Sequence, residues 1–355
     1  MTAVAARLAA RLAANGPVTF AAVMEEALYG AGGYYARDQL AIGAGGDFVT
    51  GSSLSPLFGR VTARLVDRLT AELGAAADYL EVGYGNGEHL RAVAERLSDR
   101  ERGRLLAWDR VPRQVPAGVV RLDRLGDGAV DGLVFSYELF DALPVHRLVG
   151  RAAGEGVGEL LVGWSEAAGF HYLAGDLSDP ALIDLLGGRS LAVGQVADVA
   201  PGWRPLYRSL ARALGRGLIV TCDYGYERER LFDPRVRRNG TLACHAGHRV
   251  HRDALARLGE EDLGAHVDWT ALREVGENEG LETVVLTRQA LWLVAGGLFA
   301  ELSGNGADQG GARALLDGDG MGEEIRVLVQ SRGVRAGSVL DLEILGAGEG
   351  PGTGS

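Results

Sequence analysis

The sequence predicts an α/β protein whose core is a doubly wound sheet of seven strands. Short apolar segments alternate with helical segments from residue 78 onward, and several of these segments end in a glycine or an acidic residue. The content of 47% apolar and 23% charged residues is that of a globular chain with a sizeable core. Because doubly wound sheets bind ligands at the carboxyl ends of their strands, the residues that follow each strand are the candidate site residues.

Each element is predicted from its periodicity or its terminal residues. Helical spacing and a proline in the first turn predict helices at Val18–Tyr29 and Leu57–Leu73, and a further helix follows at about Glu88–Leu97. Short apolar runs between them are typical of buried strands. The seven predicted strands are Asp78–Val82, Leu105–Trp108, Val119–Leu122, Gly132–Ser136, Gly217–Cys222, Leu281–Thr287 and Ile325–Val329.

The basic residues are unusual because all 36 are arginine and none is lysine. This excludes enzymes that need a lysine amine, among them Schiff-base, pyridoxal phosphate and Walker-A enzymes. The net charge of −11 makes nucleic acid an unfavourable partner. Much of the content of 54 glycines follows no structural period and is interpreted as genomic bias.

Other features bear on localisation. Cys222 and Cys244 form neither a C-x-x-C motif nor a disulfide framework, which favours a reducing compartment. The segment Met1–Gly16 is interpreted as an ordinary first helix, with a transit peptide as the alternative, because leucines repeat at helical spacing. The longest apolar stretch is shorter than the ~20 residues of a membrane span, so we expect a cytoplasmic protein without a membrane partner.

The strongest local motif is a strand followed by Glu81-Val82-Gly83-Tyr84-Gly85-Asn86-Gly87 and a helix. Glycines in such a turn let the backbone approach a ligand and expose amides at the helix start. The spacing differs from the G-x-G-x-x-G of dinucleotide enzymes, which makes a nicotinamide oxidoreductase the less favoured interpretation. An acid followed by the tighter turn indicates S-adenosylmethionine, with Asp109 after the next strand placed to bind ribose hydroxyls. A turn of purely structural purpose is the alternative.

A second motif, Ser136-Tyr137-Glu138-Leu139-Phe140-Asp141-Ala142-Leu143-Pro144, follows the fourth strand. In this fold class the position faces the group that is transferred. Two carboxylates three residues apart could hold a cationic acceptor or accept its proton. Acids that merely favour a solvated helix start remain the alternative.

Together these motifs resemble the MidA-type family of S-adenosylmethionine-dependent methyltransferases, whose mitochondrial members are complex I assembly factors that dimethylate a protein arginine. The resemblance runs from about Gly16 to Gly333. Besides the two motifs above it includes these segments: Gly33–Tyr35, Gly45–Thr50, Ser55–Gly59, Asp223–Gly225, Gly247–His248, Ala265–Trp269 and Met321–Glu323. It implies a seven-stranded class I methyltransferase fold, which is Rossmann-like, with an N-terminal helical segment and insertions.

The resemblance also implies roles for particular residues. The residues implied to bind the cofactor, S-adenosylmethionine, are Asp47, Thr50, Glu81, Gly83, Gly85, Gly87, Asp109 and Glu138. Glu138 and Asp141 are the implied acceptor-binding and catalytic acids. His248 and His266 fall on family positions and are the candidate proton relays, although a loop whose histidines only order the backbone is the alternative.

The sequence departs from the family pattern at four positions. Tyr84 and Asn86 replace the proline and arginine of the family turn, Ser53 replaces a glutamate, and Tyr137 replaces an asparagine or histidine. The first two leave the glycines of the turn in place. The other two could line the acceptor pocket, so cofactor binding carries over better than specificity for arginine.

No metal is predicted. The run Cys244-His245-x-x-His248-x-x-His251 contains suitable zinc ligands, but its spacing does not place them all on one helical face.

We expect three regions. Residues 1–75 form an N-terminal helical segment that covers the cofactor and acceptor, and residues 334–355 form a glycine-rich tail. Residues 76–333 form the core. It carries insertions at about 145–190, read as β-hairpins, and at 224–270, read as irregular and polar, and both are expected to cover the acceptor site.

The favoured function is transfer of a methyl group to a nitrogen, by resemblance that of a protein arginine. The alternatives are methylation of a small metabolite or a modified peptide, and a non-catalytic assembly factor that binds the cofactor. The oligomeric state stays open.

Overall fold

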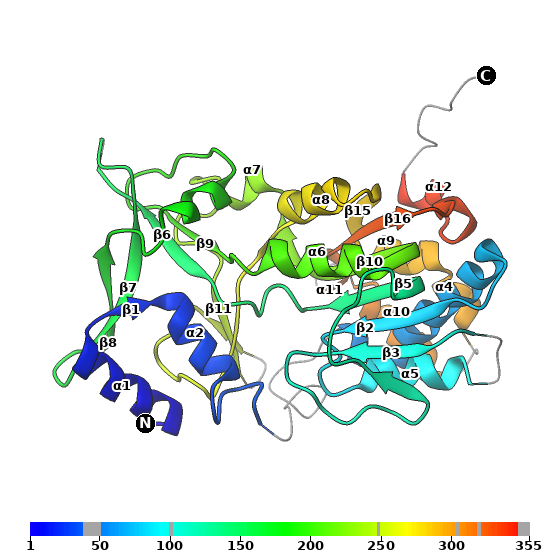
Figure 1. Cartoon of the computed structure of the whole chain (residues 1–355), viewed down its shortest axis with the longest axis horizontal. Coiled ribbons are helices and arrows are strands. Elements are labelled where there is room, and N and C mark those ends of the chain that lie inside the picture. Colours follow the sequence, from blue (N-terminus) through cyan, green and yellow to red (C-terminus); the bar gives the residue numbers. More distant parts are fainter. Residues whose placement is uncertain are drawn as a thin grey trace.

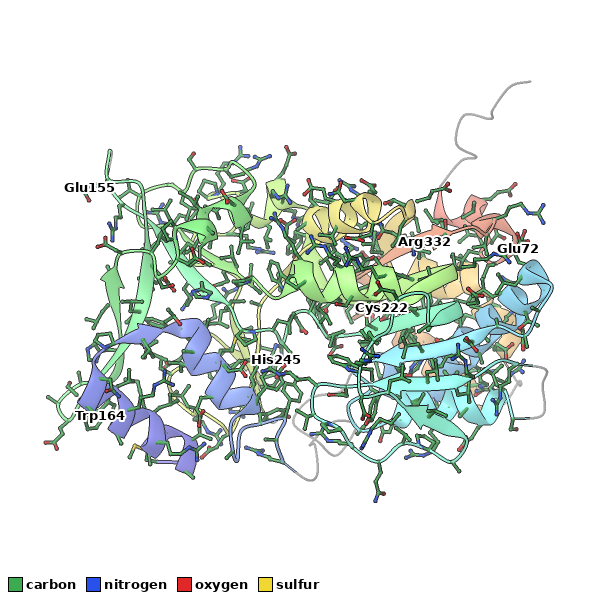
Figure 2. All side chains as sticks on the ribbon, viewed as in Figure 1. Glu72, Glu155, Trp164, Cys222, His245 and Arg332 are labelled. Atoms are coloured by element: carbon green, nitrogen blue, oxygen red, sulfur yellow. The ribbon has the colours of Figure 1, made fainter. Side chains whose placement is uncertain are left out.

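The computed structural model describes residues 1–37, 51–98, 102–152, 154–246, 249–302, 306–317 and 321–346. The chain forms two lobes, a larger one around a mostly parallel sheet and a smaller one around an antiparallel sheet (Figure 1). Side chains fill both lobes. Cys222 and Arg332 lie in the larger lobe and Trp164 in the smaller, whereas His245 lies where the two meet (Figure 2).

The large sheet has the strand order β15-β16-β10-β5-β2-β3-β4, and the short strand β14 (Val267–Asp268) pairs in parallel with the last two residues of β10. Only β16 runs antiparallel to its neighbours. The bounds are β2 Asp78–Val82, β3 Leu105–Trp108, β4 Val119–Arg121, β5 Val130–Tyr137, β10 Leu214–Tyr226, β15 Glu282–Arg288 and β16 Ile325–Arg332. All seven predicted strands are therefore present, and the predicted fold class is confirmed. Strand order reverses between β2 and β5, which is where such sheets bind ligands.

Helices cover both faces of this sheet because alternate strand residues are apolar on both sides. Tyr79, Leu133 and Val220 pack toward one cluster, while Leu80, Val134 and Ile219 pack toward the other. The first cluster takes in α4 (Pro56–Leu73), α5 (Glu88–Arg96), α9 (Gln289–Gly296) and α10 (Gly306–Leu315). The second takes in α6 (Trp203–Ala213) and α8 (Trp269–Asn278).

The start of α4 follows the expected capping chemistry. Ser55 accepts a hydrogen bond from the Leu57 N–H with its hydroxyl oxygen at 3.2 Å, and Pro56 occupies the first turn. The short helix α3 (Gly51–Leu54) precedes it. No helix in the described ranges is both long and apolar enough to cross a bilayer.

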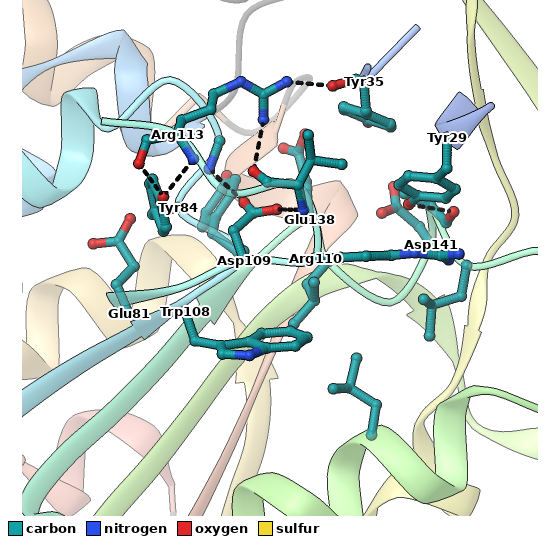
Figure 3. Close-up of a pocket in the computed structure, with 18 of the residues that line it drawn as sticks. Tyr29, Tyr35, Glu81, Tyr84, Trp108, Asp109, Arg110, Arg113, Glu138 and Asp141 are labelled. Carbon is teal, nitrogen blue, oxygen red and sulfur yellow. Dashed lines mark hydrogen bonds between the residues drawn. The ribbon is translucent and has the colours of Figure 1, made fainter. Parts of the chain in front are cut away.

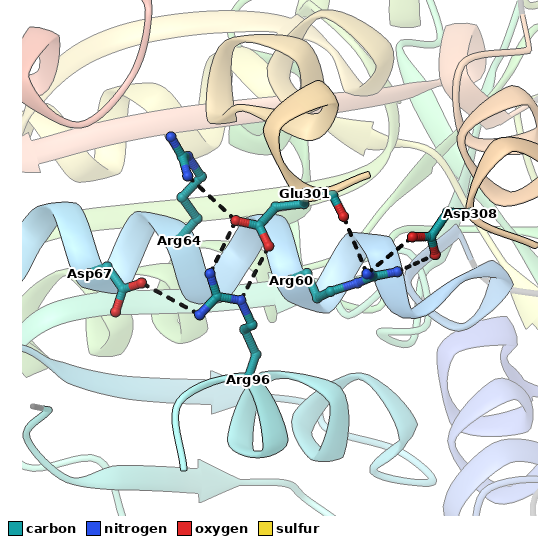
Figure 4. A network of polar contacts seen from close by, with 6 residues as sticks. All are labelled: Arg60, Arg64, Asp67, Arg96, Glu301 and Asp308. Atoms are coloured by element: carbon teal, nitrogen blue, oxygen red, sulfur yellow. Dashed lines mark hydrogen bonds and ion pairs between the residues drawn. The ribbon is translucent and has the colours of Figure 1, made fainter. Parts of the chain in front are cut away.

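An ion-pair network ties α4 to the segments that pack on it (Figure 4). Glu301, in η2 (Leu298–Glu301), accepts hydrogen bonds from Arg96 at 3.2 Å with both carboxylate oxygens. Arg64 on α4 lies 3.5 Å from the same carboxylate, and Arg60 pairs with Asp308 of α10. The network is partly shielded from solvent, so it fixes α4, α5 and α10 relative to one another.

The smaller lobe joins the N-terminus to the first insertion. Its sheet has the order β1-β7-β6-β9, all antiparallel, with β8 beside β7. The bounds are α1 Ala3–Asn15, β1 Val18–Thr19, α2 Phe20–Tyr29, β6 His146–Gly150, β7 Val157–Ser165, β8 Gly169–Gly175, η1 Pro180–Leu186 and β9 Val196–Val199. The first helix and the β-hairpins are thus present as predicted.

Two predicted boundaries shift for physical reasons. The predicted helix Val18–Tyr29 begins only at Phe20, because Thr19 caps the Ala22 N–H with its side chain and its backbone pairs with β7. Within residues 1–75, α1 and α2 pack in the smaller lobe, whereas α4 packs on the large sheet.

The second insertion is not irregular, contrary to expectation. After α7 (Arg228–Leu231) it forms a three-stranded sheet of β11 (Ala243–Ala246), β12 (Arg249–His251) and β13 (Asp262–Gly264), in the order β12-β11-β13. Single buried side chains such as Cys244 and Leu263 hold these short strands against the core. Strands of three or four residues carry too little periodicity to be recognised in a sequence.

The prediction of a glycine-rich tail from residue 334 is wrong for residues 334–346, which the structure describes. Val339 and Leu340 are buried in the cluster beside α9, and Leu345 anchors α12 (Leu342–Leu345) after the short turn η3 (Ala336–Ser338). Burial of these apolar side chains keeps residues 334–346 on the core. The helix α11 (Met321–Glu324) precedes β16. Residues 347–355 lie outside the described residues.

Candidate active site

A cavity of about 370 Å³ opens at the carboxyl ends of β2, β3 and β5, beside the point where strand order reverses (Figure 3). Both lobes contribute to its wall. Its lining includes six of the residues predicted for the site, namely Glu81, Gly83, Gly85, Asp109, Glu138 and Asp141. Residues that the sequence did not assign to the site also line it, among them Tyr29, Trp108, Arg113 and Asp262.

Glu81, on β2, places a buried carboxylate at the edge of this cavity. The Tyr79 hydroxyl donates to its Oε2 at 2.7 Å, and His89 Nδ1 lies 2.9 Å from the same oxygen. Because both partners hold the carboxylate from within the fold, its position is fixed before any ligand binds.

The glycine turn after β2 requires its glycines for backbone reasons. Gly83, Gly85 and Gly87 have positive φ angles of 76°, 51° and 73°, which side chains rarely tolerate. At Gly83 a Cβ would also come within 2.8 Å of a Leu139 side-chain carbon. Gly83 and Gly85 line the cavity, whereas Gly87 serves as the left-handed residue that starts α5.

Asp109, directly after β3, connects this turn to the next strand. Its Oδ2 accepts a hydrogen bond from the Gly85 N–H at 3.1 Å, and its Oδ1 accepts one from the Val111 N–H at 2.8 Å. Burial raises the pKa of this carboxyl, and the two backbone donors oppose that rise. Each oxygen keeps lone-pair capacity for further donors, such as the hydroxyls of a sugar.

Tyr84, one of the departures from the family turn, ties the turn to the segment after β3 (Figure 3). Its hydroxyl accepts a hydrogen bond from the Arg113 N–H at 2.8 Å and donates to the Arg113 carbonyl at 2.7 Å. The Arg113 guanidinium in turn donates to the carbonyl of Tyr35. These contacts connect the cofactor turn to the N-terminal segment.

The acidic motif after β5 places two carboxylates in the same cavity. Glu138 has a φ of 47° and is the one non-glycine residue with a positive φ among the described residues. One oxygen of Glu138 and one of Asp141 are buried without a hydrogen-bond partner in the described part of the chain. Buried oxygens without donors are costly, so both are suited to receive donors from a ligand.

Two more acids surround this motif. Asp223, three residues before the end of β10, accepts hydrogen bonds at its Oδ2 from the N–H groups of Leu139, Phe140 and Asp141 at 3.1, 2.8 and 3.4 Å. Asp262, on β13, lines the cavity from the second insertion, and its Oδ1 accepts a hydrogen bond from the Tyr35 hydroxyl at 2.8 Å.

Burial and mutual repulsion disfavour ionisation of these acids. Burial, followed by the charges of Asp223 and Asp262, raises the pKa of Glu138 well above its usual range. Burial and the charges of Asp223, Glu138 and Asp262 do the same to the pKa of Asp141. Burial raises the pKa of Asp223 to about 7, against the opposing effect of its backbone donors. A cation bound among these acids would favour their ionised forms and so lower their pKa values again.

Aromatic side chains form a further part of the cavity wall, next to the acids. Tyr29 stacks on Tyr35 with ring centroids 5.6 Å apart, and its hydroxyl donates to the Ala142 carbonyl at 3.0 Å. The guanidinium carbon of Arg110 lies 4.1 Å from the centre of the Tyr29 ring, and Arg110 also pairs with Glu25. The smaller lobe therefore supplies part of the cavity wall.

The remaining predicted residues lie elsewhere. His266 is not among the residues lining the cavity; it packs against Tyr224 and Tyr226, with ring centroids 6.4 and 5.3 Å away. Burial, followed by the charges of Arg237 and Arg252, lowers its pKa to about 4.

Asp47, Thr50 and His248 lie outside the described residues, as does the side chain of Ser53. Tyr137, the other departure from the family, lines the cavity and donates to Gln289 Oε1 at 2.7 Å.

Cys244, His251 and Glu261 bring possible metal-ligand atoms within 4.8 Å of one another. The Asp253 N–H donates to His251 Nδ1 at 3.2 Å, which assigns the ring proton to Nε2, 2.9 Å from Glu261 Oε2. A ring in this tautomer donates to Glu261 and offers no lone pair to an ion. Arg257 pairs with the other Glu261 oxygen at 3.2 Å, so we interpret the group as structural.

The cavity fits S-adenosylmethionine by the chemistry of its lining. A fixed carboxylate at Glu81 suits an ammonium group, and the Asp109 carboxylate suits ribose hydroxyls. Between them, glycines without side chains leave the backbone of the turn accessible. The acceptor acids Glu138 and Asp141 lie in the same cavity, so donor and acceptor could meet there.

Comparison with known proteins gives a consistent result. The family model of putative S-adenosyl-L-methionine-dependent methyltransferases matches residues 77–287. The mitochondrial protein arginine methyltransferase NDUFAF7 of Danio rerio is 25% identical over 328 residues, which cover 77% of this chain and 71% of that protein. The NDUFAF7 homologue of Drosophila melanogaster is 26% identical over 333 residues, covering 78% and 70%.

A solved structure resembles most of the chain. The crystal structure of a "likely methyl transferase" from Burkholderia thailandensis, bound to S-adenosyl-homocysteine, is 28% identical with a TM-score of 0.83 and covers 94% of this chain and 92% of that one. A native crystal structure from the same organism gives a TM-score of 0.80 at 28% identity, with the same coverage. This chain therefore belongs to the MidA-type family of S-adenosylmethionine-dependent methyltransferases, and S-adenosylmethionine is its methyl donor.

Proposed function

We propose that the chain methylates a nitrogen of a cationic acceptor, and that this acceptor is an arginine side chain of a protein. The observation that carries the proposal is a group of acids at the cavity that the cofactor turn also lines: Glu138, Asp141 and Asp262 line it, and Asp223 binds the backbone of the acidic motif. The names of the NDUFAF7 relatives, protein arginine methyltransferases at about a quarter identity, support the same acceptor.

The acids would perform two tasks. A guanidinium is planar and carries five donors, so two carboxylates three residues apart can bind it through several charge-assisted hydrogen bonds. The unpartnered oxygens of Glu138 and Asp141 would receive these donors. Because a protonated guanidinium is a poor nucleophile, one carboxylate would also take up the proton that the reacting nitrogen loses.

The raised pKa values of both acids suit this second task. A carboxyl that holds its proton more tightly than usual is a stronger base when ionised, and the arriving cation favours its ionised form. The cofactor supplies an electrophilic methyl group on a sulfonium, so the contribution of the chain is alignment of the acceptor nitrogen and exclusion of water. Tyr29 and Tyr35 provide apolar surface for that exclusion.

A second acceptor class is a small cationic metabolite or a modified peptide. The large Tyr137 ring, present in place of the smaller family residue, lines the cavity and is fixed by Gln289. A ring of this size beside Glu138 would favour a slender acceptor.

Radiolabelled methyl transfer into a host-cell lysate tests the proposal. Label in protein, recovered as methylarginine after hydrolysis, is expected, whereas label confined to small molecules would refute the protein acceptor.

Glu138→Gln and Asp141→Asn should each lower kcat/KM by about 10- to 100-fold, from the loss of a charge-assisted hydrogen bond of ~1.5–3 kcal/mol. The exposed Glu166→Gln, in the turn between β7 and β8, is the matched control. Cofactor affinity, measured by calorimetry, should stay unchanged in all three variants, and its loss in Glu138→Gln would assign that acid to the cofactor instead.

A further inference from the structure

A second cavity, of about 320 Å³, lies at the same edge of the large sheet, where β10 and β15 end and β16 begins. Three arginines line it: Arg230 from α7, Arg288 at the end of β15 and Arg326 at the start of β16. Such a concentration of positive charge is notable in a chain with a net charge of −11.

The charges of this cavity are not balanced by its own acids. Arg288 pairs with Glu323 at 3.0 Å, and Glu227, the one acid of the lining, pairs with Arg273 at 3.3 Å. Among the described residues, no carboxylate lies within ion-pair distance of the Arg230 or Arg326 guanidinium groups. Arg326 instead donates to the Glu323 carbonyl, at 3.0 Å.

An independent observation also points to a ligand. The indole of Trp269 lines the cavity and is 1% exposed, yet its Nε1 has no hydrogen-bond partner in the described part of the chain. An indole N–H can only donate, and a buried donor without an acceptor is costly. Burial and the neighbouring Arg288 lower the pKa of Arg326, which is the signature of a cation short of counter-charge.

The cavity is close to the acceptor site along β10. Asp223 contacts the acidic motif, whereas Gly225 and Tyr226, two and three residues further on, line the second cavity. At ~3.3 Å per residue, the two sites are separated by roughly 10 Å along the strand. The acidic cavity and the arginine-lined cavity therefore present opposite charges to one molecule lying across the sheet edge.

We propose that the cavity lined by Arg230, Arg288, Arg326 and Trp269 binds an anionic group, a carboxylate or a phosphate, of the molecule that carries the acceptor nitrogen. Arginine guanidinium groups recognise both kinds of oxyanion through paired N–H donors, and the indole N–H adds one more. The role in acceptor recognition rests on the proposed function, but the anion site itself does not.

Calorimetric titration of the full chain with inorganic phosphate and, separately, with glutarate tests the site without any methyl transfer. Saturable one-to-one binding of at least one probe in the millimolar range is expected, and the probe that binds identifies phosphate or carboxylate as the preferred group. Arg326→Gln and Arg230→Gln should each weaken this binding by about tenfold. Arg235→Gln is the matched control, because it removes the same charge from an exposed position outside the cavity, and it should bind like the wild type.

Two results would overturn the proposal: no saturable binding of either probe to the wild-type chain, or equal binding by the wild type and both cavity variants. Because Arg230 is exposed on α7, its variant keeps the test valid even if Arg326→Gln fails to fold. Methyl transfer into protein without anion binding would refute the anion site alone. Anion binding without methyl transfer into protein would refute the protein acceptor alone.

Discussion

Replacement of His266 by phenylalanine should remove a pH-dependent loss of stability. The lowered pKa of about 4, against 6.5 for an ordinary histidine, means that the unfolded chain binds a proton more tightly than the folded one between these values. Stability from this residue is therefore complete above pH 6.5 and falls as the pH drops to 4. The full difference is worth about 3 kcal/mol, and about 2 kcal/mol is already lost at pH 5. Partial exposure of the ring makes both figures upper values.

Phenylalanine keeps the ring packed against Tyr224 and Tyr226 but cannot titrate. Urea unfolding of both chains at pH 7, 6 and 5 measures the effect, and their difference in unfolding free energy should change by up to about 2 kcal/mol in favour of the variant at pH 5. The other titrating groups are the same in both chains, so their contributions cancel in this difference. A constant difference across the pH range would refute the reasoning. Since His266 does not line the acceptor cavity, the variant should also keep its methyl-transfer rate at pH 8 within about twofold of the wild type.

Three further outcomes are expected. Gly83→Ala, at a φ of 76°, should lower the unfolding free energy by about 1–2 kcal/mol in urea and weaken S-adenosylmethionine binding in calorimetry. For a cationic acceptor, kcat/KM should rise with pH as Asp141 ionises. Asp223→Asn should move this rise to lower pH, because the charge of Asp223, next to burial, raises the pKa of Asp141. A pH profile that is the same in the variant and the wild type would contradict this. Burial raises the pKa of the Cys222 thiol and that of Cys244, the latter to about 12, so a thiol reagent at pH 8 should modify neither until urea unfolds the chain.

The large sheet was predictable because its signals are local. Each strand, beginning with β2 (Asp78–Val82), is an apolar run with a distinct end. The turn after β2 needs a backbone conformation that only glycine adopts readily, so its glycines mark it in the sequence. Asp109 was predictable for the same reason, since it directly follows β3. The fold class and the cofactor part of the cavity thus follow from short stretches of sequence.

The acceptor side was only half predictable, since its parts come from distant segments. Asp262 lies on a three-residue strand within an insertion, and Tyr29 at the end of an N-terminal helix, so neither carries a local pattern that marks a site. A hydrogen bond from Tyr35 to Asp262 joins residues 227 positions apart. The resemblance placed Asp223 in a family motif but gave it no role. His266 differs from these residues, because a matching motif position predicted a site role for a residue that is not among those lining the cavity, so that role stays a prediction.

Hydrogen bonds to Asp223 fix the backbone conformation of the acidic motif. Glu138 donates its N–H to the Cys222 carbonyl at 2.9 Å, which continues the pairing of β5 with β10, and then turns at a φ of 47°. Such a backbone costs about 1–3 kcal/mol. It turns the next three N–H groups toward a single oxygen of Asp223, and the hydrogen bonds to this oxygen offset that cost. The strained residue and its support are 85 positions apart in sequence but adjacent on neighbouring strands. The direction in which Glu138 faces the cavity is therefore set by β10, so a substitution at Asp223 should act on the acceptor through the position of Glu138 as well as through the pKa of Asp141.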